Sequence, residues 1–276
     1  MSSVRTMIGC GIAGVFVLLG AANAEAQALF PDKNLEAAVR DVLKKGANDP
    51  LAEADLKNVY ILKAKKKGIA DLTGLDKCTN MAELDLAGNQ IKDAKPLSTL
   101  VNCQSLDLSA NQLTDVAPLA PLVKLQYLQL DGNQIESVEP LKDLKKLSAL
   151  YLSKNKIKSV APLAGLEKLS SLYLDENQIT DIEPLKGLKW LSLLGLRKNQ
   201  VADVNALSGM TELRYTFLEG NKVTDLAPIV AMAKKDAEGE KRFAPYWRLY
   251  LTENPLSDAG KQQVEELKKI GVRVTN

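Results

Sequence analysis

The pattern of apolar and polar positions repeats every 22 residues over most of the chain. Leucine or isoleucine fills fixed positions in phrases such as LDLSANQL, LQLDGNQI and LYLDENQI, and each phrase contains one asparagine. Because successive strand side chains point to opposite faces, the L-x-L portion predicts one short strand per unit. The recurring asparagines are Asn89, Asn111, Asn133, Asn155, Asn177, Asn199 and Asn221.

This period and the pattern L-x-x-L-x-L-x-x-N-x-L predict a leucine-rich repeat. A single unit cannot bury its own apolar side, so the units must stack to form a core. Proline in most of the return legs excludes long helices there. We therefore expect an α/β repeat solenoid: a leucine-rich-repeat horseshoe with a parallel concave β-sheet, short convex turns and helical caps at both ends.

The pattern divides the chain into four segments. Residues 1–28 are predicted to be a signal peptide and residues 29–58 a helical N-terminal cap. About nine repeats should fill residues 59–256, and residues 257–276 should form a cap helix and strand. Near residues 228–246 the interval between matching asparagines rises from 22 to 33, so we expect an insertion that contains a helix.

Capping residues place the helices of both caps. In the N-terminal cap, we expect a first helix that ends at Gly46 and a second over residues 50–56 that Asp49 caps. At the other end, Ser257 is predicted to begin the last helix and Gly271 to end it.

The N-terminal segment has the composition of an export signal. Arg5 precedes an apolar run of 15 residues at 8–22, and small residues follow at Ala24, Ala26 and Ala28, where cleavage is expected. The run is shorter than the roughly 20 apolar residues that cross a membrane. We expect a secreted or periplasmic protein, and an uncleaved anchor is the alternative.

Composition removes several classes of function. There are 36 Lys and Arg against 34 Asp and Glu, and no histidine. Net charge therefore gives no indication of nucleic-acid binding, and the commonest general base and metal ligand is missing. Phosphate-loop, zinc-protease and nucleophile motifs are also missing. The sequence predicts a monomer that is no enzyme, needs no cofactor or metal, and does not insert into membranes after signal cleavage.

Three sets of polar residues have a structural explanation. The asparagines can bond backbone groups inside each turn. Cys78 and Cys103 fill leucine positions and should be buried, although export would also permit a disulfide. One aspartate per unit should bond the following turn, with a calcium ladder as the alternative. These aspartates are Asp93, Asp115, Asp181, Asp203 and Asp225.

Candidate binding residues lie on the strands, between the leucines. Five of the chain's seven tyrosines and one of its four phenylalanines fall there. Exposed aromatic residues are typical interface anchors, although β-propensity alone also favours them on strands. Tyr151 and Tyr173 should stack, and Gly195 should leave a gap beside Leu193, unless glycine there serves close backbone packing. The candidate residues for partner binding are Asp85, Asp107, Tyr127, Tyr151, Tyr173, Arg197, Tyr215, Phe217 and Tyr250.

The repeats resemble those of bacterial internalins. The phrase LxxLxLxxNxIxDIxPLxxL, and the opening FPDxNLExAVRxxL of the cap, carry this resemblance over residues 29–276. Internalins are secreted or surface proteins that bind other proteins through the concave face. The resemblance therefore implies an exported, non-catalytic protein that binds a protein or peptide there. The alternatives are an intracellular subunit similar to phosphatase-1 regulators and an enzyme of envelope carbohydrate chemistry.

Overall fold

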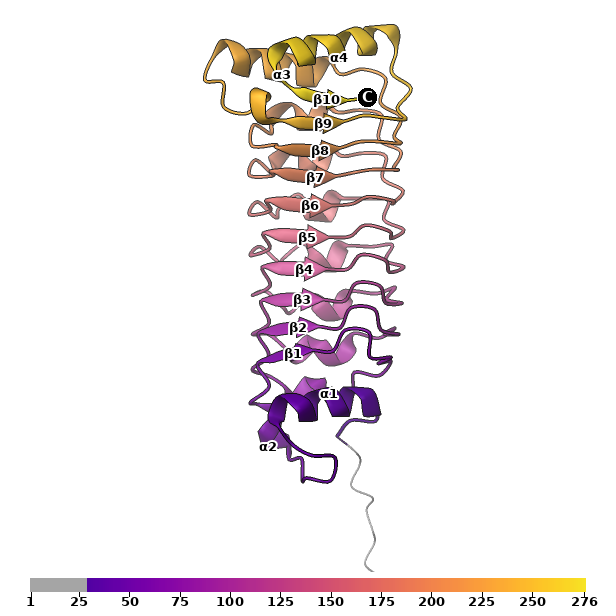
Figure 1. Cartoon of the computed structure of the whole chain (residues 1–276), viewed down its shortest axis with the longest axis vertical. Coiled ribbons are helices and arrows are strands. Elements are labelled where there is room, and N and C mark those ends of the chain that lie inside the picture. Colours follow the sequence, from indigo (N-terminus) through magenta and orange to yellow (C-terminus); the bar gives the residue numbers. More distant parts are fainter. Residues whose placement is uncertain (1–28) are drawn as a thin grey trace, which may run out of the picture.

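The computed structural model describes residues 29–276, and the predicted signal peptide lies outside the described residues. Figure 1 shows an elongated stack of strands between a helical cap at each end. The ten strands of this described part form one parallel sheet in chain order, which confirms the predicted solenoid. The strands are β1 (Ile61–Lys63), β2 (Glu83–Asp85), β3 (Ser105–Asp107), β4 (Tyr127–Gln129), β5 (Ala149–Tyr151), β6 (Ser171–Tyr173), β7 (Leu193–Gly195), β8 (Tyr215–Phe217), β9 (Arg248–Tyr250) and β10 (Arg273–Thr275).

Strand register follows the sequence period. Neighbouring strands from β1 to β8 pair residues that are 22 positions apart, as Tyr151 does with Tyr173. Tyr215 of β8 instead pairs with Arg248 of β9, because helix α3 (Ala227–Glu238) occupies the insertion between them. Helix α3 thus lies in the segment where the interval between matching asparagines is longer.

Apart from the leg that contains α3, the legs that return behind the sheet are short 3-10 turns, as proline predicted. Each places one or more apolar side chains in the core, so the apolar interior is continuous from coil to coil. The turns are η1 (Leu75–Lys77), η2 (Lys95–Thr99), η3 (Ala117–Leu119), η4 (Glu139–Leu141), η5 (Ala161–Leu163), η6 (Glu183–Gly187), η7 (Asn205–Gly209) and η8 (Ala244–Tyr246).

The asparagines bond backbone groups of their own coil and of neighbouring coils. Asn155 is 8% exposed. Its Nδ2 donates to the carbonyls of Leu130 and Leu152, both at 3.0 Å, and its Oδ1 accepts from the Ile135 N–H at 3.0 Å. The same pattern recurs from Asn111 to Asn221, so the structural role of this column is confirmed.

The aspartates and cysteines also have the structural roles that the pattern favoured. Asp93 accepts a hydrogen bond from the Lys95 N–H at 2.7 Å, and the equivalent aspartates bond the residue two positions on. Cys78 and Cys103 are buried with free thiols, so the disulfide alternative is wrong. Burial raises the pKa of Cys78 to about 12 and that of Cys103 to about 11.

Two helices, α1 (Lys33–Leu43) and α2 (Glu53–Leu56), form the N-terminal cap beneath β1 in Figure 1. Asp32 caps α1 and also accepts from the Ala70 N–H at 2.8 Å, which ties the cap to the first coil. Two details of the prediction are wrong. Lys44 takes the left-handed conformation that ends α1, ahead of Gly46. Asp49 bonds the Gly46 N–H instead of capping α2.

Helix α4 (Asp258–Ile270) and strand β10 close the C-terminal end. The Ser257 hydroxyl accepts from the Gly260 N–H at 3.0 Å at the start of α4, and Gly271, with a φ of 107°, ends it. Both predictions for this helix are confirmed. Within residues 29–276, no helix is long and apolar enough to cross a membrane.

Candidate functional site

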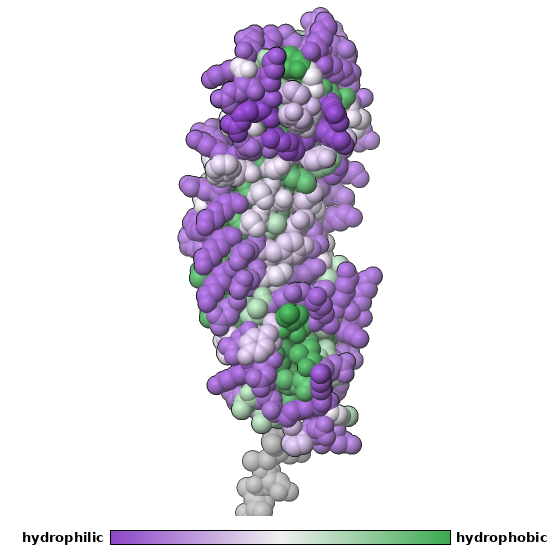
Figure 2. Space-filling model, turned by 60° about the vertical axis from the view of Figure 1, so that its left-hand side comes forward, coloured by the Kyte–Doolittle hydropathy of each residue, from purple (hydrophilic) through white to green (hydrophobic). Residues whose placement is uncertain are grey.

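The outward side of the sheet is made by residues that alternate with the buried leucines. In β6, Leu172 is buried, whereas Ser171 and Tyr173 on either side of it are half-buried. The same pattern holds in β2 to β5 and in β9. We use concave face for the outward residues of β2 to β9 and for the outward residue two positions after each strand, such as Asp175, Arg197 and Glu219. Figure 2 shows a strip of near-neutral hydropathy between hydrophilic borders along the middle and C-terminal coils.

Three tyrosines on β4, β5 and β6 form a continuous group, the tyrosine stack. The rings of Tyr151 and Tyr173 stack at 4.9 Å between centroids with an interplanar angle of 12°, as the register predicted. Tyr127 extends the stack, with its centroid 5.3 Å from that of Tyr151 and its hydroxyl donating to Gln129 Oε1. Burial in this group raises the pKa of Tyr127 to about 12. The stack therefore offers a preformed, partly desolvated aromatic surface.

The predicted gap at Gly195 is wrong. Gly195 is buried, and a Cβ added to it would lie 2.9 Å from Cδ1 of Tyr173 and 2.8 Å from Oδ2 of Asp175. The Tyr173 ring and the Asp175 carboxylate already occupy the space that the missing side chain leaves. The glycine therefore makes room for two neighbouring side chains, whereas the alternative explanation was the close approach of another backbone segment.

A second group follows on β7 to β9, the arginine–aromatic cluster. The Arg197 guanidinium lies 3.7 Å from the centroid of Phe217, and the rings of Phe217 and Tyr250 stack at 4.8 Å. Tyr215 completes the group, with its ring 6.3 Å from Phe217 and 5.4 Å from the Arg248 guanidinium. Cation–π contacts of this kind attract a cation to the face of an aromatic ring.

Two acidic residues beside Arg197 were not among the predicted candidates. Arg197 Nε donates to Glu219 Oε1 at 3.0 Å, and its Nη1 lies 3.7 Å from Asp175 Oδ2. Burial raises the pKa of Asp175 even though the Arg197 N–H bonds it. The other Glu219 oxygen is buried without a hydrogen-bond partner. The 22-residue spacing places Asp175, Arg197 and Glu219 in one column, and this signal could have identified them.

The N-terminal part of the concave face is acidic. Asp85 and Asp107 each accept one backbone N–H two residues on, from Ala87 at 3.0 Å and from Ser109 at 2.8 Å. Neither forms an ion pair within residues 29–276. The predicted residues thus lie on one face but form three groups: acids, tyrosine stack and arginine–aromatic cluster.

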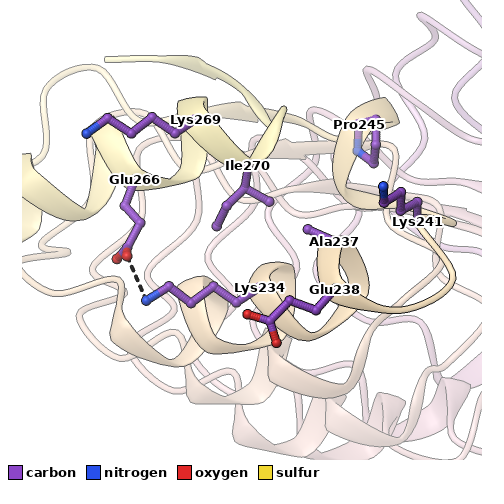
Figure 3. A pocket seen from close by; sticks show the side chains of 8 residues that line it. All are labelled: Lys234, Ala237, Glu238, Lys241, Pro245, Glu266, Lys269 and Ile270. Atoms are coloured by element: carbon purple, nitrogen blue, oxygen red, sulfur yellow. Dashed lines mark ion pairs between the residues drawn. The ribbon is translucent and has the colours of Figure 1, made fainter.

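A cavity of about 570 Å³ lies away from this face, between α3 and α4. Figure 3 shows Lys234 of α3 and Glu266 of α4 forming an ion pair across it, at 2.6 Å from Nζ to Oε1. Its lining is composed of lysines, glutamates and small apolar side chains. This ion pair joins the two helices.

Comparison with known proteins identifies the repeats. A family profile described as leucine-rich repeats in two copies matches residues 101–143 and 145–187, and a single-repeat profile matches residues 77–94. The solved structure of internalin C2 from Listeria monocytogenes is 34% identical, with a TM-score of 0.71, over 74% of this chain and 91% of that one. The chain belongs to the internalin family of leucine-rich-repeat proteins. Family members of this kind are protein-binding scaffolds and are typically non-catalytic.

More distant structures share the fold alone. A leucine-rich-repeat protein from Leptospira interrogans is 20% identical, with a TM-score of 0.54, over 80% of this chain and 73% of that one. The plant peptide hormone receptor RGFR1 is 23% identical, with a TM-score of 0.55, over 66% of this chain and 30% of that one. No curated protein sequence matches the chain.

Proposed function

We propose that this internalin-family protein is an exported monomer that binds a protein or peptide through its concave face. The tyrosine stack is the observation that supports this most, because three aromatic rings stand on a surface where the core does not need them. Tyrosine supplies large contact area with a polar end and is enriched among interface residues that dominate affinity. A partner covering the stack and both flanking groups would bury about 1,600 Å² in total, the usual size of a specific complex.

Charge along the face supports a defined orientation of the partner. The acidic residues Asp85 and Asp107 lie at one end without ion-pair partners among the described residues, whereas at the other end Arg197 pairs with Asp175 and Glu219 and Arg248 lies over Tyr215. Complementary charges on a partner would fix its direction along the solenoid and speed its association. Peptide recognition on this fold has a precedent, because the plant receptor RGFR1 was solved in complex with RGF2.

Replacing Tyr151 and Tyr173 together by serine tests the proposal. Partners are first captured by crosslinking in exported fractions and identified by mass spectrometry, and the affinity of each is then measured with purified protein. Both side chains are partly solvated, so the coil should keep its fold, and we expect at least a 30-fold loss of affinity from two interface anchors.

The matched control replaces Tyr60 and Tyr246 by serine. These tyrosines are 54% and 63% exposed and lie outside the concave face. Its affinity should equal that of the unchanged protein. Equal affinity of the Tyr151/Tyr173 variant would contradict binding through this face.

Export is tested separately by N-terminal sequencing of cell-associated and exported protein. We expect a new N-terminus after Ala24, Ala26 or Ala28 in the exported fraction. An intact Met1 with no exported protein would favour the intracellular regulatory subunit instead.

A further inference from the structure

One edge of the solenoid carries a row of lysines that ends in an exposed tryptophan. The row lies where the chain turns into each strand, on the left of Figure 1, and Figure 2 brings this edge forward. Four consecutive turns, each of two residues, contribute to it. The pairs are Val123 and Lys124, Lys145 and Lys146, Glu167 and Lys168, and Lys189 and Trp190.

The backbone fixes these side chains outward. Each pair lies between two buried leucines joined by a hydrogen bond, for example from the Leu147 N–H to the Leu144 carbonyl at 3.0 Å. The same bond recurs in the other three turns at 3.0 to 3.1 Å. Because strands of one sheet lie about 4.8 Å apart, equivalent turn residues form a column with roughly that spacing. We call this column, with its exposed lysines and Trp190, the lysine edge.

Positive charge on the lysine edge is left uncompensated. Five lysines have no carboxylate within 4.0 Å among the described residues. Glu167 is the one acid within the four pairs. The turns before and after them contain no lysine, so the feature is local and is not a property of the repeat. These lysines are Lys124, Lys145, Lys146, Lys168 and Lys189.

Trp190 indicates what kind of anionic partner fits. It is 67% exposed, the most exposed large apolar side chain among the described residues, although the same turn position elsewhere holds Lys, Asn or Glu. Tryptophan favours the boundary between water and lipid, where the ring is apolar and its N–H stays wet. Exposed Val123, 49% accessible, lies at the other end of the lysine edge. A straight row of cations between two apolar side chains matches a flat anionic lipid surface better than a single anionic ligand.

We propose that the lysine edge docks this protein on anionic lipid headgroups, with Trp190 at the level of the headgroups. This contact is peripheral and involves no membrane-spanning segment. It lies on a different side of the coils from the tyrosine stack, so a docked molecule keeps its concave face free. The inference does not depend on the proposed partner binding.

The chain's two tryptophans make the test direct. Trp247 is buried and its Nε1 donates to Thr216 Oγ1 at 2.9 Å, so its emission should not change on docking. Vesicles of phosphatidylcholine alone are compared with vesicles containing phosphatidylglycerol. On the second kind only, Trp190 emission should shift to the blue and become protected from iodide, and added salt should reverse both effects.

Two double variants, each of which removes two positive charges, locate the contact when their cosedimentation with vesicles is measured. Each lysine near an anionic surface contributes about a fivefold gain in partitioning, so Lys124→Gln with Lys168→Gln should weaken binding about 25-fold. The control, Lys92→Gln with Lys158→Gln, removes exposed lysines from another side and should bind as the unchanged protein does. Equal losses in both variants, or no binding to phosphatidylglycerol vesicles, would overturn the proposal. Binding to inorganic polyphosphate without binding to vesicles would also overturn it.

Discussion

Replacing Asn155 by alanine should test how strongly the asparagine column holds the coils together. The change removes the acceptor for the buried Ile135 N–H and the donor for the carbonyls of Leu130 and Leu152. An unpaired buried N–H costs about 1–3 kcal/mol and each lost hydrogen bond about 1 kcal/mol, so the free energy of unfolding should fall by about 3–5 kcal/mol. That is a large fraction of the about 5–15 kcal/mol that stabilises a typical domain.

The assay is urea unfolding followed by far-ultraviolet circular dichroism. Lys156→Ala is the control, because that exposed side chain donates a long hydrogen bond to Gln134 Oε1, at 3.5 Å, and its loss should change the free energy of unfolding by about 0.5 kcal/mol or less. The loss in free energy of unfolding for Asn254→Ala should lie between those for Asn155→Ala and Lys156→Ala. Asn254 makes the same kinds of hydrogen bond but is half-buried at the C-terminal end, where water can replace them. If Asn155→Ala lowers the free energy of unfolding by less than about 1 kcal/mol, the hydrogen bonds of the asparagine column do not hold the coils together in this way.

Three further predictions concern single residues. Lys154→Gly should raise stability by about 0.5–1 kcal/mol in the same urea assay, because Lys154 has a φ of 58° where three other coils have glycine; a loss of stability would contradict this. Cys78 and Cys103 should resist a thiol reagent at pH 8 in the folded protein and react after unfolding, as measured by mass spectrometry of labelled peptides, because burial raises the pKa of both thiols. Tyr127 ionises near pH 10 when unfolded and near pH 12 when folded, so its contribution to stability should be present below pH 10 and lost between pH 10 and 12. A Tyr127→Phe variant should lack this part of the pH dependence, and identical profiles would refute the pKa shift.

The sequence was sufficient for the features that depend on the repeat. The 22-residue period determines which residues lie side by side, and so it correctly predicted the stacking of Tyr151 on Tyr173 and the backbone bonds of the asparagines. The change of period to 33 residues likewise located α3, because extra residues must leave the coil between two strands that still pair.

Features that depend on side-chain direction could not be predicted in this way. Tyr127 pairs with Ala149 in register, yet its ring packs diagonally against Tyr151, because long side chains reach neighbours beyond the residue directly opposite. Tyr173 does lie directly opposite Gly195, but the register does not show that its ring leans over the glycine and, with the Asp175 carboxylate, closes the predicted gap. The end of α1 was misplaced because Lys44 adopts a left-handed conformation that usually favours glycine.

Hydroxyl-radical footprinting in the presence of a captured partner shows directly whether the partner covers the concave face. We expect Tyr151, Tyr173 and Phe217 to lose reactivity when the partner binds, whereas exposed Tyr60 and Tyr246 should keep theirs. Protection of Tyr60 or Tyr246 with unchanged reactivity of the tyrosine stack would contradict recognition through the concave face.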